Sequence, residues 1–322
     1  MEIPTKKRMQ IFSGRGFPEL AREVVDHLGM RLGDVDIHEF SNGEIYCRFK
    51  ENVRGSDVFV IQTHCSPVNT NIMEQLVMLD ALKRASAKRI VAVAPFYGYA
   101  RQDRKAESRE PITAKLLADM LTKAGADRVV SVDLHAGQIQ GFFDTPVDHL
   151  TALPLLVQWL REHYADEHLV VATPDAGGTR LALKFRNRLP DASIAFVAKT
   201  RTGHNVAKTL AVVGDVEGHT CVLVDDMIDT AGTICGAAEA LVAHGAKRIV
   251  AVATHPVLSA PACDRLAASV IERVVVTNSL PLPADCHLDK IEVVSIAPIV
   301  ASTMKAIFED ESVSGLFDDD NQ

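Results

Sequence analysis

An eight-residue segment occurs twice in this chain of 322 residues, at a separation of about half its length. Ala-Lys-Arg-Ile-Val-Ala-Val-Ala fills residues 87–94 and again residues 246–253. Each copy follows a stretch of helical period, and each such stretch follows a short apolar run. A chance identity is the alternative, since buried strands draw on few residue types, but the matching flanks favour duplication. We therefore predict two homologous domains, over residues 1–150 and 151–322.

Short apolar runs rich in Val and Ile alternate along the chain with longer segments of helical period. They lie at residues 58–61, 90–93, 129–132, 169–171, 221–224 and 249–252. Continuous apolar strands separated by helices are typical of parallel sheets that are covered on both faces. The sequence thus predicts an α/β fold with two doubly wound parallel sheets, in which ligands bind at the carboxyl ends of the strands.

Charge and cysteine content narrow the class of protein. The 34 Lys and Arg residues against 42 Asp and Glu give a net charge of −8, which argues against a nucleic-acid partner or an anionic membrane surface. No uncharged apolar run approaches the ~20 residues that span a bilayer, and the N-terminus shows no apolar signal core. The six cysteines form no Cys-x-x-Cys motif. We expect reduced thiols in a cytoplasmic protein.

The most specific short motif follows an apolar run and reads Asp-Asp-Met-Ile-Asp-Thr-Ala-Gly-Thr over residues 225–233. Small residues and the N–H groups of a helix start form a cradle for an anion. Asp225 and Asp226 would repel a phosphate, but they suit sugar hydroxyls or a bridging metal. An acidic helix cap at Asp229 or Thr230 is the structural alternative, and it explains one acid rather than three. The pattern favours a phosphorylated sugar and resembles the phosphoribosyl-pyrophosphate motif of type I phosphoribosyltransferases.

Two loops of the first half differ in their expected roles. Residues 62–70, which correspond to the acidic motif of the second half, lack its carboxylates, so we predict that only the second copy kept a ligand loop. Residues 101–105 read Arg-Gln-Asp-Arg-Lys and follow the apolar run at 90–93. Such a cation cluster at a strand end suits a polyphosphate, with a solvated basic loop as the alternative.

Several side chains near strand ends suit a divalent cation. His135 follows an apolar run, with Asp133 and Asp144 nearby in sequence. A hydrogen-bonded structural histidine is the alternative, but the neighbouring acids favour contact with metal or phosphate. Asp175 lies in a Gly-rich loop after another run, where it is either a turn residue or part of a magnesium–water shell.

Two further loops carry candidate residues on weaker signals. Residues 39–45 combine an aromatic side chain with Asn-Gly-Glu, which alone indicates a turn between strands. Residues 198–205 hold Lys199 and Arg201 in a loop that also contains Gly203.

Together these segments closely resemble class I ribose-phosphate pyrophosphokinase over nearly the whole chain. The matching stretches PFYGYARQDRK, DLHAGQIQGFF, TPDAGG and LVDDMIDTAGT occur in the order typical of that family. Members transfer the β,γ-pyrophosphoryl group of ATP to the anomeric hydroxyl of ribose 5-phosphate, giving 5-phosphoribosyl 1-pyrophosphate and AMP for nucleotide biosynthesis. The resemblance implies Mg²⁺ as the cofactor and two domains of the type I phosphoribosyltransferase-like fold.

The resemblance also implies roles for residues of this chain. Contacts to ATP are implied for Phe40, Asn42, Gly43, Glu44, Arg101, Gln102, Asp103, Arg104 and Lys105. Contacts to ribose 5-phosphate are implied for Asp225, Asp226, Asp229, Thr230, Ala231, Gly232 and Thr233. Positions linked to the metal are His135, Asp175, Asp133, Asp144 and Asp148. Lys199 and Arg201 match the catalytic Lys-x-Arg of the family.

Regulation and assembly are implied in the same way. Family members form hexamers. They are often inhibited by ADP and activated by phosphate at a site between subunits. Arg54 and Ser312-Val-Ser314 of this chain resemble residues of that site. Glu107 stands where many relatives carry a basic residue, and its carboxylate would repel phosphate oxygens. This departure puts ordinary allosteric control in question more than catalysis.

Two rival functions remain open at this point. A phosphoribosyltransferase that consumes the activated sugar would share residues 225–233 but would not need residues 42–44 or 101–105. An inactive regulatory homologue would share the fold but is expected to lack site residues, all of which are present here. The dipeptide Gly-Lys never occurs, so no Walker A loop exists and a standard P-loop kinase is disfavoured.

Overall fold

The computed structural model describes residues 7–200 and 209–313. The chain divides into two compact units, which we treat separately. The first unit comprises the chain up to Thr151 together with the segment from Ile296 onward, and the second comprises Ala152–Ser295. The first change of unit follows Thr151, next to the predicted boundary at residue 150, whereas the C-terminal segment lies in the first unit and not in the second.

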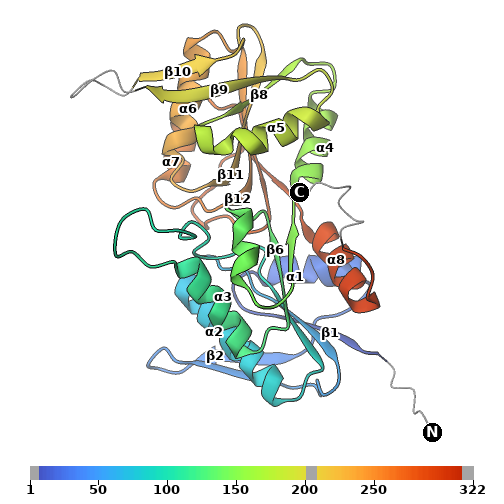
Figure 1. Ribbon diagram of the computed structural model, residues 1–322. Helices are drawn as coiled ribbons and strands as arrows, with labels where there is room; N and C mark the ends of the chain where they lie inside the picture. The colour runs from blue at the N-terminus through green and yellow to red at the C-terminus, as the bar shows by residue number, and fades with distance from the viewer. Residues whose placement is uncertain (1–6, 201–208, 314–322) are drawn as a thin grey trace. The chain divides into compact units, whose positions relative to one another are not determined.

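The first unit is built on a parallel sheet of strand order β1-β4-β5-β6-β7. These strands are β1 (Met9–Ser13), β4 (Asp57–Ile61), β5 (Arg89–Val93), β6 (Arg128–Val132) and β7 (Val147–Leu150). The helices are α1 (Pro18–His27), α2 (Val68–Arg84), α3 (Thr113–Ala124), the 3₁₀ segment η1 (Gly137–Phe142) and α8 (Ala297–Glu309). Helix α2 packs beside α3, and α1 beside α8 (Figure 1). A separate hairpin of β2 (Val35–Glu39) and β3 (Ile45–Phe49) packs on α2 through β3.

The second unit holds a larger sheet of strand order β10-β9-β8-β11-β12-β13-β14. Its strands are β8 (Leu169–Thr173), β9 (Ser193–Thr200), β10 (Thr209–Val213), β11 (Thr220–Ile228), β12 (Arg248–Pro256), β13 (Arg273–Thr277) and β14 (Ile291–Val294). All neighbours are parallel except β9 and β10. The helices are α4 (Leu153–His163), the short η2 (Ala176–Gly178), α5 (Thr179–Arg188), α6 (Gly232–Ala243) and α7 (Ala262–Ala268).

Both sheets lie buried between layers of helices because their inner strands carry apolar residues on each face. Every residue of β4 and of β8 is buried, as expected for a parallel sheet between helix layers. The predicted α/β class with doubly wound parallel sheets is confirmed. Within the described residues, no helix is both long and apolar enough to cross a bilayer.

The duplicated segment forms equivalent strands in the two units. In the first unit β5 runs parallel to β4, and in the second β12 runs parallel to β11. The arginine that opens each strand makes an ion pair: Arg89 with Asp57 at 2.6 Å and Arg248 with Glu167 at 2.8 Å. The repeated sequence thus encodes an inner strand of each parallel sheet.

Helix α8 joins the first unit through named contacts at the amino ends of its strands. Arg89 donates to the carbonyl oxygen of Ile307 at 2.8 Å and pairs with Asp310 at 3.1 Å. Lys7 also pairs with Asp310, at 2.6 Å. Met304 and Ile307 are buried, so the helix adds to the apolar core of this unit. This packing explains why the first unit extends beyond its predicted end.

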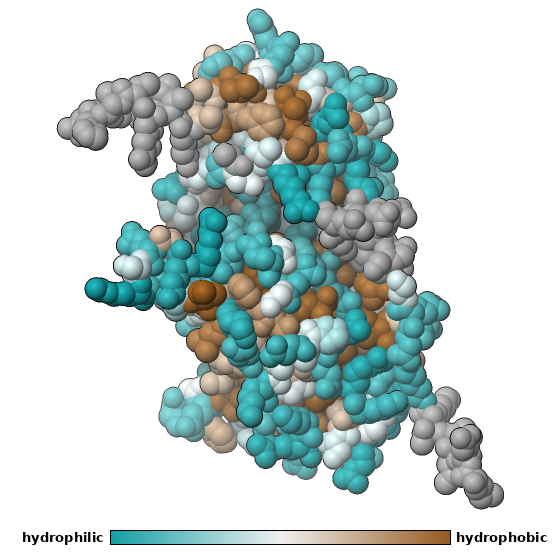
Figure 2. Space-filling model, in the orientation of Figure 1, coloured by the Kyte–Doolittle hydropathy of each residue, from teal (hydrophilic) through white to brown (hydrophobic). Residues whose placement is uncertain are grey.

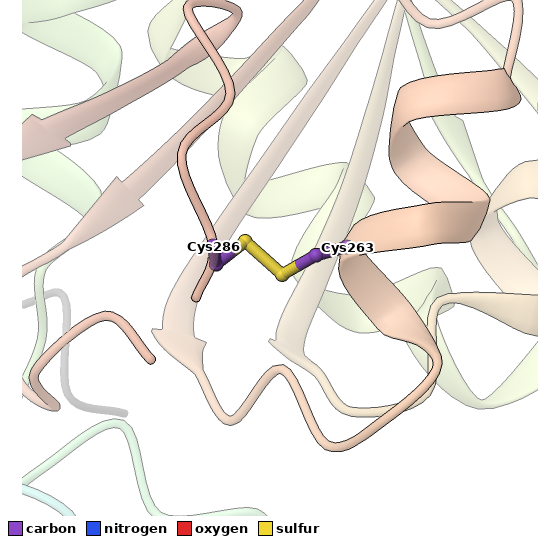
Figure 3. Close-up of a disulfide and its surroundings, with 2 residues drawn as sticks. All are labelled: Cys263 and Cys286. Atoms are coloured by element: carbon purple, nitrogen blue, oxygen red, sulfur yellow. A yellow bond between two sulfur atoms is a disulfide. The ribbon is translucent and has the colours of Figure 1, made fainter. Parts of the chain in front are cut away.

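One pair of cysteines departs from the expected reduced state. Cys263, near the start of α7, forms a disulfide with Cys286, which lies in the segment before β14 (Figure 3). Their Cα atoms are 5.7 Å apart, within the usual range for a disulfide. Sequence spacing alone could not reveal the pair because the chain between them forms a helix, a strand and a loop. Cys47, Cys65, Cys221 and Cys235 are free thiols.

Candidate functional site

The acidic motif of the second unit lies at the carboxyl end of its central strand. Strand β11 extends through Ile228, four residues beyond the predicted apolar run, because Asp225 to Ile228 continue to pair with β12. Asp225 and Asp226 are therefore strand residues, both half-buried. Only Asp229, Thr230 and Ala231 separate this strand from α6.

The turn into α6 has a geometry that the capping alternative does not explain. Ala231 is the N-cap residue of α6, and no side-chain hydrogen bond caps the helix there. Its backbone is left-handed, with φ of 59°, a conformation that costs free energy for a residue with a side chain. Such strain beside a helix start is typical of ligand sites, where backbone N–H groups must be aimed at a bound group.

The carboxylates beside this turn influence one another electrostatically. Burial, followed by the neighbouring charge of Asp226, raises the pKa of Asp225 to about 8. The charge of Asp175 raises it further. Asp226 donates its backbone N–H to Asp225 Oδ1 at 2.9 Å, which acts in the opposite direction. A group with this pKa can exchange a proton near neutral pH or bind a hydroxyl as either donor or acceptor.

Asp175 lies at the end of β8, the strand next to β11. One of its carboxylate oxygens accepts from Gly177 N–H at 2.8 Å, so Asp175 stabilises the turn in which it lies, as one of its two predicted roles requires. Gly178 allows close packing there, because a Cβ at this position would lie 2.2 Å from Thr173 Oγ1. The structure thus brings Asp175 to the same sheet edge as Asp225 and Asp226, a grouping that the sequence did not predict.

In the first unit, the loop after β6 carries His135. Asp133 holds a left-handed backbone, with φ of 37°, and His135 and Asp144 are exposed. His149 on β7, which sequence reasoning missed, accepts from Leu134 N–H at 2.8 Å through Nε2. The sequence signal that could have identified His149 is its place directly after Asp148, a predicted metal-linked acid.

Asp148 has a different environment from the other predicted metal positions. Both of its carboxylate oxygens accept from Arg128, at 2.9 and 2.7 Å. Burial raises the pKa of Asp148, and the Arg128 pair opposes that shift. Because successive strand residues face opposite sides, Asp148 and His149 serve different faces of the sheet. Asp148 is therefore held in an ion pair with Arg128, and its link to a metal stays a prediction.

The basic loop of the first unit is exposed over most of its length. Arg101, Gln102, Arg104 and Lys105 are exposed, and Asp103 accepts from Gln138 at 2.7 Å. That bond links the basic loop to the η1 segment, which follows His135. The cations therefore stand in solvent at the carboxyl end of β5, as a polyphosphate contact requires.

The predicted adenine-contacting segment is the turn of the β2–β3 hairpin. Phe40 donates its N–H to Glu44 O at 2.8 Å, and Asn42 Oδ1 accepts from Glu44 N–H at 3.2 Å. Phe40 is half exposed and stands edge-on to Tyr46 and His38, which stack on each other with ring centroids 4.6 Å apart. His38 and Tyr46 thus extend the aromatic surface beyond the residues that the sequence indicated. Gly43 supplies the positive φ of 86° that the turn requires.

A buried polar network fills the loop of the first unit that corresponds to the acidic motif. Gln62 donates to Glu74 at 3.0 Å, and Glu74 accepts from Arg15 at 2.5 Å. His64 accepts from Gly98 N–H and contacts Gln75, each at 2.9 Å. The polar side chains of this region thus bond to one another, and the loss of this loop as a binding site stays a prediction.

The predicted catalytic pair is only partly within the described residues. Lys199 belongs to β9, where its backbone pairs with Leu210 of β10. Arg201 lies outside the described residues, as does Ser314 of the predicted effector segment.

No group of three or more His, Cys, Asp or Glu side chains in residues 7–200 and 209–313 is placed to hold a metal ion. The five predicted metal positions therefore form no preassembled cage there. Mg²⁺ commonly takes one or two protein ligands and completes its shell with water and substrate phosphates. His135 is exposed in the first unit and Asp175 is half-buried in the second, so each is accessible as a single protein ligand of that kind.

Comparison with known proteins gives consistent matches over nearly the whole chain. Residues 9–125 match the model of the N-terminal domain of ribose phosphate pyrophosphokinase, and residues 186–318 match the phosphoribosyl synthetase-associated domain. The chain is 54% identical to a ribose-phosphate pyrophosphokinase of Streptomyces avermitilis, covering 98% of this chain and 97% of the relative. It is 52% identical to that of Mycobacterium tuberculosis, with the same coverage of each.

A solved structure is similar in fold as well as sequence. The crystal structure of phosphoribosylpyrophosphate synthetase from Mycobacterium smegmatis matches with a TM-score of 0.90 and 52% identity. The match covers 94% of this chain and 100% of the other.

Proposed function

The chain belongs to the ribose-phosphate pyrophosphokinase family, and from that premise we propose how its residues make 5-phosphoribosyl 1-pyrophosphate. ATP donates its β,γ-pyrophosphoryl group to the C1 hydroxyl of ribose 5-phosphate, and AMP leaves. The observation that carries the assignment of the sugar site is the tight turn from β11 into α6, with two carboxylates before it and a strained Ala231 within it.

In this proposal the turn from Asp229 to Thr233 receives the 5-phosphate. Backbone N–H groups at the start of α6 and the Thr hydroxyls donate to its oxygens. Asp225 and Asp226, which precede the turn on β11, accept from the ribose hydroxyls. The raised pKa of Asp225 lowers the electrostatic cost of placing two acids beside a phosphate.

ATP is assigned to loops of the first unit. Phe40 offers an exposed aromatic surface for stacking of adenine, supported by Tyr46 and His38. Asn42, Gly43 and Glu44 form the turn beside it, and the exposed Arg101, Gln102, Arg104 and Lys105 neutralise the phosphates, with Asp103 tying their loop to η1.

The chemical step needs positioning and positive charge more than a strong base. Displacement at phosphorus spreads negative charge over the nonbridging and leaving oxygens. Lys199, Arg201 and the basic loop are the groups that would stabilise this charge. Mg²⁺, held by the phosphates with His135 and Asp175, would supply further positive charge when bound. Asp133 and Asp144 match further positions that the family links to the divalent cation.

We also propose a cytoplasmic homo-oligomer, a hexamer by family resemblance, that responds to ADP or phosphate in a form altered by Glu107. An exposed apolar face on α2 and α3 supports association: Met73, Leu116 and Met120 are 51%, 56% and 37% exposed. Hydrophobic surface over these helices interrupts the hydrophilic surroundings (Figure 2).

The test is product formation by the purified chain. With ATP, ribose 5-phosphate and Mg²⁺ but no nucleobase, we expect equal amounts of AMP and 5-phosphoribosyl 1-pyrophosphate. A phosphoribosyltransferase would release no AMP under these conditions. An inactive regulatory homologue would release none under any condition unless a second chain were added.

A further inference from the structure

Helix α7 places an arginine against the turn that we assign to the sugar phosphate. Arg265 Nη1 donates to the backbone carbonyl oxygen of Thr230 at 2.9 Å. The same nitrogen also lies close to Gly232, because a Cβ at that position would be 3.2 Å from it. Helix α7 thus brings a cation to this turn.

This bond fixes the orientation of one peptide group in the turn. In a planar trans peptide the C=O and N–H bonds point in opposite directions. Holding Thr230 O toward Arg265 therefore turns Ala231 N–H away from Arg265. The opposite orientation would exchange the two groups and present a carbonyl oxygen, which repels a phosphate.

The strained backbone of Ala231 makes this restraint necessary. Rotating the peptide between Thr230 and Ala231 changes φ of Ala231, so the turn can leave the left-handed region by such a flip. An L residue gains free energy by leaving that region, whereas glycine does not. Arg265 opposes the flip, since its guanidinium would lose a charge-assisted hydrogen bond.

The helix that carries Arg265 is itself held at both ends. The Cys263–Cys286 disulfide joins the start of α7 to the segment before β14 (Figure 3). At the other end, Lys290 Nζ donates to the carbonyl oxygens of Leu266 at 2.7 Å and Ile271 at 2.9 Å. These bonds satisfy carbonyl groups at and beyond the helix end and restrain its position.

We propose that Arg265 is a positioning residue of the sugar-phosphate turn: it holds the Thr230–Ala231 peptide so that Ala231 N–H, and not Thr230 O, is available to the 5-phosphate. The inference rests on the proposed function of this turn. Arg265 acts through the backbone of the turn, by its hydrogen bond to Thr230 O.

The test compares Arg265→Ala with the full-length wild-type enzyme. We expect the KM for ribose 5-phosphate to rise roughly tenfold, the scale of a lost charge-assisted hydrogen bond. The KM for ATP should change less than twofold, and the melting temperature should stay close to that of the wild type. Arg186→Ala on α5 is the matched control, because Arg186 is exposed and donates to the side chain of its neighbour Asn187.

A second substitution separates peptide orientation from charge. In the Arg265→Ala background, Ala231→Gly removes the penalty of the left-handed backbone, so the double variant should recover severalfold of the lost affinity for ribose 5-phosphate. Arg265→Lys should recover part of it by restoring a cationic donor. The proposal fails if Arg265→Ala leaves the KM for ribose 5-phosphate within twofold of the wild type, or if glycine gives no recovery.

Direct binding keeps this test distinct from that of the overall function. Titration calorimetry with ribose 5-phosphate measures the turn without turnover. A wild-type chain that binds ribose 5-phosphate but forms no product would contradict the proposed reaction alone, and the Arg265 variants would still be decisive. A wild-type chain that fails to bind it would overturn both.

Discussion

At the scale of single residues, the acids of the second unit carry the sharpest consequences. Asp225 was predicted to contact a ribose hydroxyl, but the sequence could not show that its pKa is raised. That shift depends on burial within β11 and on Asp226 and Asp175, which the fold brings to one sheet edge. Local sequence identifies the acids, whereas only the folded sheet determines how they share protons.

This pKa predicts a pH-dependent effect on stability. Between about pH 4 and pH 8 the unfolded chain ionises at Asp225 while the folded chain retains the proton, so this group lowers the free energy of unfolding as pH rises. Asp225→Asn keeps an acceptor for Asp226 N–H and removes the titration. Without ligands, the variant should melt above the wild type at pH 8, by about 2–4 °C for each kcal/mol relieved.

The same comparison at about pH 3, below the unfolded-state pKa of 3.8, is the control for that prediction, because Asp225 is then mostly protonated in both states and the advantage of Asp225→Asn should largely vanish. An equal gain at both pH values would mean that packing, and not proton binding, is responsible. Thermal denaturation followed by circular dichroism measures the difference.

Lys199 carries a prediction about turnover. If it stabilises charge that develops only in the transition state, Lys199→Ala should lower kcat by roughly 10²–10³ while the affinity for ATP stays nearly intact. Steady-state kinetics with a separate ATP-binding measurement distinguish the two effects. Equal losses in binding and turnover would contradict the role.

At the scale of elements, the two copies of the repeat show what a sequence can and cannot reveal. The alternation of apolar runs and helical segments predicted the parallel sheets, because burial on both faces leaves a direct signature. The missing acids of residues 62–70 also predict that this loop binds no ligand, and that stays a prediction. The network of Gln62, Glu74 and Arg15 was not predicted, since its members come from separate elements.

That network predicts how the adenine hairpin is held. Arg15 bridges the buried Glu74 and the exposed Glu39, which directly precedes Phe40. Glu39→Ala should raise the KM for ATP about two- to fivefold by loosening the hairpin, without lowering the melting temperature appreciably.

Arg15→Ala is the comparison for that variant. It removes the same contact to Glu39 but also leaves the Glu74 carboxylate buried without its cation, so it should destabilise the fold by about 1–3 kcal/mol or more. Similar melting temperatures for the two variants would show that Glu74 does not depend on Arg15.

At the scale of the whole molecule, the sequence predicted two units but not their full extent. The periodicity of residues 297–309 fits a helix in either unit, and nothing local specifies its partner. The contacts of Arg89 and Lys7 with Asp310 at the end of α8 attach this helix to the first unit. They join residues more than two hundred positions apart. The Cys263–Cys286 pair was missed because a helix, a strand and a loop lie between the two residues and only the fold brings them together.

Association should depend on the exposed apolar face of α2 and α3. Leu116→Glu places a charge in that face and should shift the chain to a smaller species in light scattering after size exclusion. Lys88→Ala changes the net charge by the same amount away from the face and should not. An unchanged assembly in both variants would exclude this face from the interface.

Because α8 completes the first unit, a chain ending at Ser295 should expose the apolar surface that Met304 and Ile307 cover. Such a truncated chain should bind a hydrophobic dye and be cut by protease within residues 7–151, while its second unit resists. Equal resistance of both units would contradict this dependence.

A growing polypeptide emerges from the ribosome with its beginning first, yet here the first-made half must wait for the last-made helix. All strands of the second unit are synthesised before α8, so this unit can fold while the first unit is still incomplete. Synthesis order and completion order are thus reversed in this enzyme, because the second unit is complete in sequence before α8 is made.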